Sequence, residues 1–201
     1  MAASKKEQIS QGALRAFAQN GYSETTMDTI AEAANVAKGT LYYHFKTKEE
    51  LFLHVNQKGV EMLIDSVTGA MKDSTRSVSE RMLYVLDEHL RFFAENRELC
   101  LLLLSISGDW QRDRLIGTVL SEYFATMEVY FRELQEEGII SPDLEVRTVA
   151  SALFGMVGFT VLRKMFREEP VYTEETRSTL IRLCQGALGI KRMTEGENAH
   201  A

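Results

Sequence analysis

A short cationic segment near the start of the chain carries the residue types best suited to chemistry. Residues 38–48 read KGTLYYHFKTK, which is three Lys, one His, two Thr and two Tyr without an acidic residue. Ammonium groups bind phosphates, and hydroxyl and imidazole groups can bond a phosphate or the edge of a base. The segment therefore has the composition of a nucleic-acid contact surface.

Enzymatic and metal chemistry have no comparable pattern. No Ser/His/Asp set, phosphate-binding loop, dinucleotide fingerprint or HExxH motif stands in a suitable context, so we predict no enzyme activity and no cofactor. His54 and His89 lack a Cys or His at ligand spacing, which favours packing or surface roles and predicts no metal site. Cys100 and Cys184 lie in apolar runs, as buried reduced thiols do.

The net charge of −6 is unevenly distributed along the 201 residues. Residues 1–50 contain six basic and six acidic residues, whereas the other 151 contain 17 basic and 23 acidic ones. The acidity therefore belongs to the second part of the chain, and the cationic segment lies in a neutral first part. A phosphate-binding surface is compatible with that distribution.

Helices must position these residues, because apolar side chains recur at spacings of three and four and the first Pro is Pro142. We predict an all-α protein. Three short helices are expected first, over residues 4–20, 25–35 and 37–45, and the last two form a helix-turn-helix candidate. The further expected helices cover residues 47–70, 82–93, 99–106, 112–137, 142–166 and a final stretch from Thr173, with a polar loop over 72–79.

The first quarter of the chain resembles the helix-turn-helix region of the TetR family of bacterial transcriptional regulators. The resemblance rests on a Gly-Tyr before Thr25-Thr26 and on three further motifs: Ile30-Ala31, the run GTLYYHF over 39–45, and KEEL over 48–51. It implies a DNA-binding domain over 3–63, with the helix-turn-helix motif at about 26–45. An effector-binding and dimerisation domain would follow over 64–193, and residues 194–201 are expected to form a disordered tail.

The resemblance also implies roles for residues in the motif. Leu41 and Phe45 are expected on the buried side of the recognition helix. Ala37 departs from the family pattern, since many relatives have a capping Ser there, so another group must satisfy the first N–H groups or the helix firms up on DNA. The implied DNA contacts are Thr26, Lys38, Gly39, Thr40, Tyr42, Tyr43, His44, Lys46 and Lys48, with Tyr43 able to serve either face.

The effector pocket and the dimer interface are less defined by sequence. Aromatic and Met residues between 51 and 137 are more often core than ligand site. The resemblance nevertheless implies a pocket among them, for which the candidates are Tyr84, Phe92, Trp110, Tyr123 and Met127. The helix over 142–166 is apolar around most of its circumference, which suits either the monomer core or a dimer interface. The interface candidates are Leu153, Gly155, Met156, Phe159, Leu180 and Leu183.

These observations predict a cytoplasmic, homodimeric regulator, a repressor of transcription that binds palindromic double-stranded DNA and is released by a small, largely apolar effector. The N-terminus has no apolar signal core, and the longest uncharged segment, over 148–162, is only 15 residues. No membrane association is therefore expected. The alternative is a helical adaptor that uses the cationic surface for a protein partner, and the salt dependence of DNA affinity separates the two.

Overall fold

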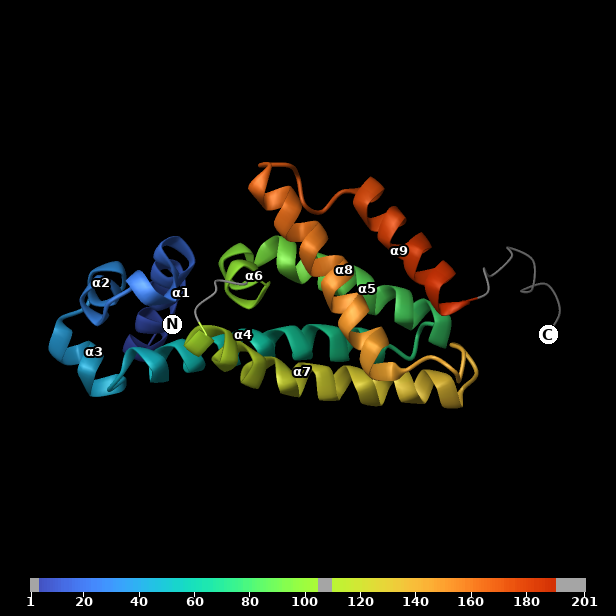
Figure 1. The fold of residues 1–201 in the computed structure, drawn as a ribbon, viewed down its shortest axis with the longest axis horizontal. Coiled ribbons are helices and arrows are strands. Elements are labelled where there is room, and N and C mark those ends of the chain that lie inside the picture. The colour runs from blue at the N-terminus through green and yellow to red at the C-terminus, as the bar shows by residue number, and fades with distance from the viewer. Residues whose placement is uncertain (1–3, 105–109, 191–201) are drawn as a thin grey trace.

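The computed structural model describes residues 4–104 and 110–190, and every regular element in those ranges is a helix, which confirms the all-α prediction. The helices are α1 (Lys5–Glu24), α2 (Met27–Ala33), α3 (Lys38–His44), α4 (Lys48–Met71), α5 (Val78–Glu95), α6 (Arg97–Leu104), α7 (Trp110–Glu136), α8 (Val146–Phe166) and α9 (Glu174–Leu188). Figure 1 shows α1, α2 and α3 at one end and a larger helical body at the other.

Five of these helices begin at a Ser or Thr whose hydroxyl accepts the N–H of the residue three positions on. Such a cap satisfies one of the free N–H groups at the helix start and contributes about 1 kcal/mol. The starts expected at Ser4, Thr47 and Thr173 are confirmed. The capped starts are those of α1, α2, α4, α5 and α9, at Ser4, Thr26, Thr47, Ser77 and Thr173.

Two predicted boundaries are wrong. The helix expected from Pro142 begins at Val146, because residues 141–145 form a turn in which the Ser141 hydroxyl donates to Asp143 rather than capping a helix. The loop expected over 72–79 ends at Ser77, where Ser77 and Glu80 form a capping box that starts α5 early. The end of the helix predicted over 99–106, the break at 108–109 and the tail lie outside the described residues.

The long helix α4 connects the two ends of the molecule. Its 24 residues, about 36 Å of helix, run from α3 into the body, where α4 packs against α5 and α7 (Figure 1). The predicted boundary between domains at 63–64 falls inside this unbroken helix, so any displacement of α4 in the body is carried to α1, α2 and α3.

The helix α6 lies between the two ends and packs against α1, α4 and α8. Two glycines allow this approach: a Cβ at Gly59 of α4 would lie 2.2 Å from Leu99 Cδ1, and one at Gly158 of α8 would lie 2.7 Å from Leu104 Cδ1. Both leucines belong to α6 and are buried. A larger residue at either glycine would force the buried leucine side chain to shift, so both glycines allow the close packing of α6 against α4 and α8.

Among the described residues, α8 is the helix long and apolar enough, by length and composition, to cross a membrane. Half of its most apolar 18-residue window is buried inside the structure. The inner residues of α8, such as Val157 and Val161, are 0% exposed, whereas Phe159 is 60% exposed and Phe166 is 71% exposed. The helix is therefore a core element on one side and an apolar surface on the other.

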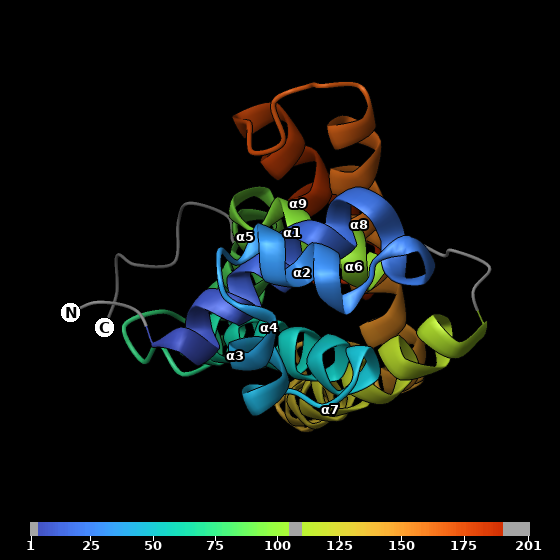
Figure 2. The same cartoon turned by 90° about the vertical axis from the view of Figure 1, so that its left-hand side faces the viewer.

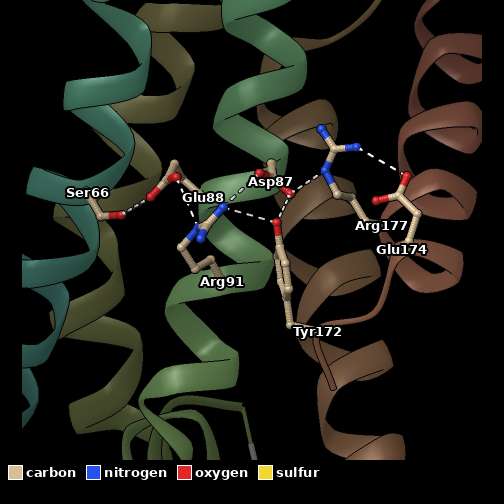
Figure 3. A network of polar contacts seen from close by, with 7 residues as sticks. All are labelled: Ser66, Asp87, Glu88, Arg91, Tyr172, Glu174 and Arg177. Carbon is tan, nitrogen blue, oxygen red and sulfur yellow. Dashed lines mark hydrogen bonds and ion pairs between the residues drawn. The ribbon is translucent and has the colours of Figure 1, made fainter. Parts of the chain in front are cut away.

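A buried carboxylate holds α9 onto the body (Figure 3). Asp87 of α5 is 5% exposed and accepts hydrogen bonds from Arg177 Nε at 2.8 Å and from the Tyr172 hydroxyl at 2.9 Å. The second carboxylate oxygen of Asp87 lies 3.4 Å from Arg91 Nη2. Arg91 also contacts Glu88 and the Tyr172 hydroxyl. One carboxylate thus joins α5, the loop before α9 and α9 itself.

We expect Asp87→Ala to lower the free energy of unfolding by about 2–3 kcal/mol, because it leaves the Tyr172 hydroxyl and the Arg177 guanidinium without their buried acceptor. Urea unfolding followed by circular dichroism measures this. Glu174→Ala is the matched control, since the Glu174 side chain is 80% exposed and lies 3.5 Å from Arg177; its expected cost is below about 0.5 kcal/mol. Equal costs for the two variants would contradict this account of α9.

Candidate nucleic-acid interface

The helix α3 has a buried side and an exposed side. Leu41 is 0% exposed and Phe45, just after the helix, is 2% exposed, so both pack inward as predicted. Tyr42 is 44% exposed and Tyr43 is 77% exposed. The two exposed rings place two hydroxyl donors on the outer surface of the three-helix end.

The turn between α2 and α3 is held by hydrogen bonds from several elements. Val36 N–H donates to Ala31 O at 3.0 Å, and Asn35 takes a positive φ of 51° to make the tight turn. From α1, Gln8 Nε2 donates to Ala34 O at 2.7 Å, and Arg15 Nη2 donates to Ala33 O at 2.9 Å. The angle between α2 and α3 is therefore fixed by the first helix.

The three lysines differ in how free they are. Lys38 and Lys46 are exposed; Lys38 pairs with Asp28 of α2 at 2.6 Å, and Lys46 Nζ donates to Tyr42 O at 2.8 Å. Ion pairs between exposed groups are weak and exchange readily for a phosphate. Lys48 is half-buried, donates to Tyr22 O at 2.8 Å and lies over the Tyr22 ring, 4.5 Å from its centroid. It ties the start of α4 to the end of α1, a structural role that sequence reasoning missed.

Of the predicted contacts, Thr26 is already engaged within the chain. Its hydroxyl accepts the N–H of Thr29, and its own N–H donates to Thr29 Oγ1 at 2.9 Å, which makes a reciprocal cap at the start of α2. Thr40 and His44 are half-buried on α3. Reaching a phosphate through the Thr26 N–H would therefore require this cap to open.

Gly39, on the first turn of α3, is exposed and has open space around it. A Cβ built at this position would meet no atom within 4 Å. Neither internal packing nor a positive φ therefore requires glycine here. No side chain caps the helix start at Ala37, as its residue type predicted.

An exposed surface, which we call the α3 surface, lies on α3 and its C-terminal turn. It is formed by Lys38, Gly39, Tyr42, Tyr43 and Lys46. Figure 2, which looks onto this end of the molecule, shows that α2 and α3 lie at its front with the body behind them. A short helix with exposed cations, hydroxyl groups and an accessible backbone can enter a DNA major groove and contact phosphates and base edges there.

The residues proposed for an effector pocket are dispersed in the structure. Tyr123 and Met127 are 0% exposed and Phe92 is 6% exposed, while the Tyr84 ring lies under the Arg76 guanidinium. Trp110, at the start of α7, is 83% exposed, so its ring lies on the surface of the single chain. None of the five lines the cavity between α1 and α4, the cavity at the α4–α5 corner with α7, or the groove between α8 and α9.

The residues proposed for a dimer interface divide into two groups. Leu153 and Leu180 are each 4% exposed within the single chain, so they pack in the monomer's own core. Phe159 is 60% exposed and Leu183 is 56% exposed, and a Cβ at Gly155 would meet nothing within 4 Å. The outer faces of α8 and α9 are therefore apolar and open, with a groove of about 280 Å³ between the helices.

The comparisons with known proteins agree with this geometry. A family model described as bacterial regulatory proteins, tetR family, matches residues 9–55, and one described as YsiA-like protein, C-terminal region, matches 56–175. The fatty acid metabolism regulator protein of Bacillus subtilis is 26% identical over 159 residues, which are 78% of this chain and 81% of that protein.

Two solved structures share the fold along nearly the whole chain. A Clostridium perfringens protein described as a fatty acid metabolism regulator is 27% identical, with a TM-score of 0.76 and coverage of 93% of this chain and 100% of that one. A Bacillus subtilis transcriptional regulator in complex with stearoyl-CoA is 23% identical, with a TM-score of 0.75 and coverage of 88% and 96%.

Proposed function

Because the chain belongs to the TetR family of bacterial regulatory proteins, we propose that this transcriptional regulator acts as a homodimeric repressor whose two α3 helices bind a palindromic operator. The observation that carries this proposal is the α3 surface, which combines exposed cations, hydroxyl donors and an open glycine backbone on a helix whose preceding turn is bonded to α1. As a DNA-binding regulator, the protein would act in the cytoplasm.

The proposal needs two copies of the chain. One seven-residue helix contacts only a half-site, and two recognition helices must lie about one DNA turn apart to bind both half-sites of a palindrome. The open apolar faces of α8 and α9 support a two-fold interface, because large apolar residues such as Phe159 and Leu183 are exposed there in the single chain.

We propose a fatty acyl compound as the effector. Support comes from the relatives of known class that match most of this chain, two of which are described as fatty acid metabolism regulators. In one conformation of the dimer, α4 would hold the two α3 helices at a separation that does not match the two operator half-sites. An effector that binds the body more tightly in this conformation would weaken DNA binding. By linkage, operator DNA would then weaken effector binding by the same factor.

The experiment that tests the proposed function is selection of bound fragments from genomic DNA by the purified protein, followed by footprinting. We expect a palindromic site close to a promoter. The logarithm of affinity should fall linearly with the logarithm of salt concentration, with a slope of about −0.9 for each phosphate contacted. A flat salt dependence or the absence of any selected sequence would favour the helical adaptor instead.

Gly39→Ala should separate folding from DNA recognition. The added Cβ meets nothing within the chain, so the helix propensity of Ala should raise the free energy of unfolding by about 0.5–1 kcal/mol. Operator affinity, measured by fluorescence anisotropy, should nevertheless fall at least about tenfold, since the methyl group occupies the space needed for close approach to DNA.

Gly69→Ala is the matched control for this variant. Gly69 lies within α4, is exposed, and also has no atom within 4 Å of a built Cβ. The control should gain similar stability and keep wild-type operator affinity. If Gly39→Ala also binds the operator as the wild type does, the first turn of α3 does not approach the DNA closely and the α3 surface is misassigned.

A further inference from the structure

One cavity in the helical body has the features of a ligand site. It lies where the end of α4, the start of α5 and the second half of α7 meet, and its volume is about 620 Å³, within the range of small-molecule sites. Met71, Val129 and Leu134 supply an apolar part of its wall. Its polar part includes Arg81 and Tyr130, whose hydrogen bonding is incomplete among the described residues.

Two residues that line this cavity each carry a buried hydrogen-bond donor that has no partner among the described residues. Tyr130 is 7% exposed, and its hydroxyl makes no hydrogen bond. Arg81 donates from Nη1 to Met71 O at 3.2 Å, but its Nε is buried and makes none. Buried polar groups in folded proteins are nearly always hydrogen-bonded, because an unpaired group loses its hydration without gaining a partner. Two orphan donors on one cavity point to an acceptor that arrives with a ligand.

The charges around the cavity define which acceptor fits. Arg81 and Lys72 stand on the α4–α5 side, and Glu133 and Glu137 on the α7 side, so the formal charge of these four residues is zero. Burial raises the pKa of the Tyr130 hydroxyl to about 12, which keeps it a donor at neutral pH. A multiply charged group placed at the two donors would meet the two carboxylates, whereas an acyl oxygen of low charge next to an apolar chain would meet two donors and an apolar wall.

We propose that Arg81 Nε and the Tyr130 hydroxyl bind the acyl oxygen of an amphipathic acyl ligand, with its chain against Met71, Val129 and Leu134. This inference rests on the proposed function, because it assigns a place to the effector. The same oxygen occurs in an acyl thioester and in a free fatty acid. The two sources share this chemistry, and the experiment includes one probe for each.

The test is isothermal titration of the full-length protein with stearoyl-CoA and, separately, with stearate, both below their critical micelle concentrations. Tyr130→Phe should weaken binding about tenfold or more, since it removes one hydrogen bond to the ligand. The same variant should not lower the urea midpoint of unfolding, because the hydroxyl has no partner among the described residues. Arg81→Gln should weaken binding in the same way, and Tyr84→Phe, outside the cavity, should leave it unchanged.

The operator affinity of each sample, measured without probe, separates this inference from the proposed function. Binding of either probe that weakens in Tyr130→Phe supports the site and identifies the source of the oxygen. Equal affinity in wild type and Tyr130→Phe overturns the site. Failure of both probes to bind a wild type that still binds operator DNA also overturns it, and leaves the DNA-binding function standing. Loss of operator binding in the wild type would instead refute the proposed function.

Discussion

Phe159→Glu is expected to convert the proposed dimer into monomers and to lower operator affinity by roughly a hundredfold or more. Phe159 is 60% exposed in the middle of the outer face of α8, next to the open Gly155 and one turn from Met156. In a two-fold interface this face meets its own copy, so the substitution places two carboxylates in an apolar environment without a partner.

The size of the effect follows from the linkage of two half-sites. When both recognition helices belong to one dimer, binding of the second is intramolecular and can strengthen overall affinity by about 10²–10⁴. A monomer loses that gain although its α3 surface is intact. Helix content by circular dichroism should therefore stay at the wild-type value while operator binding, measured by anisotropy, nearly disappears.

Val129→Glu is the matched control for the dimer prediction. Val129 is also an exposed apolar residue on a long helix, at 58%, but it lies on α7 rather than on α8 or α9. Sedimentation velocity should show a dimer for this variant and a monomer for Phe159→Glu. A Phe159→Glu protein that remains dimeric would mean that the copies meet through a different face.

The caps and turns of the fold were predictable because they depend on residues close together in sequence. Ser4, Thr47 and Thr173 each cap a helix through an N–H three positions on, so their residue types were sufficient. The start of α8 was not predictable in this way. Gln135 Nε2 donates to Ser141 O at 3.0 Å and to Leu144 O at 2.8 Å, and these bonds hold the segment as a turn.

The candidate site shows the same division between local and distant interactions. The inward side of α3 was correctly predicted from the spacing of Leu41 and Phe45. The tie from Lys48 to Tyr22 O crosses 26 positions, so the composition of the cationic segment could not distinguish Lys48 from the freer Lys46.

The exposed side of α8, which we propose as the dimer face, was not predictable, for a related reason. An apolar pattern on nearly all sides of α8 does not reveal which side the monomer covers. Only the packed structure separates buried Leu153 from exposed Phe159.

His89 is a polar group at the centre of the body that sequence analysis treated as ordinary packing. The ring is 0% exposed, and its Nδ1 lies 2.7 Å from Val85 O, while its Nε2 lies 2.5 Å from the Tyr123 hydroxyl oxygen. A carbonyl only accepts, so Nδ1 carries the proton and donates to Val85 O. Nε2 then accepts from Tyr123, which joins α5 to α7 through a neutral imidazole.

This arrangement should make the protein's stability fall in mild acid. Burial lowers the pKa of His89 from 6.5 to about 4. Between these values the unfolded chain binds a proton that the folded chain does not, so the stabilising contribution is complete above pH 6.5 and is lost as the pH falls toward 4. The loss amounts to about 3 kcal/mol at the acid end of that window.

His89→Gln should remove this pH dependence, because the amide does not titrate. The variant is expected to be less stable than wild type at pH 7, since the Tyr123 hydroxyl and Val85 O lose their hydrogen bonds to the imidazole. The free energies of unfolding of the two proteins should converge as the pH falls from 6.5 to 4. Urea unfolding at several pH values measures the difference.

His54→Gln is the comparison, because His54 is only half-buried and burial lowers its pKa less strongly. Parallel pH curves for wild type and His89→Gln would show that the imidazole stays neutral in the unfolded chain or is protonated in the folded one, and either result would contradict the hydrogen-bonded neutral pair.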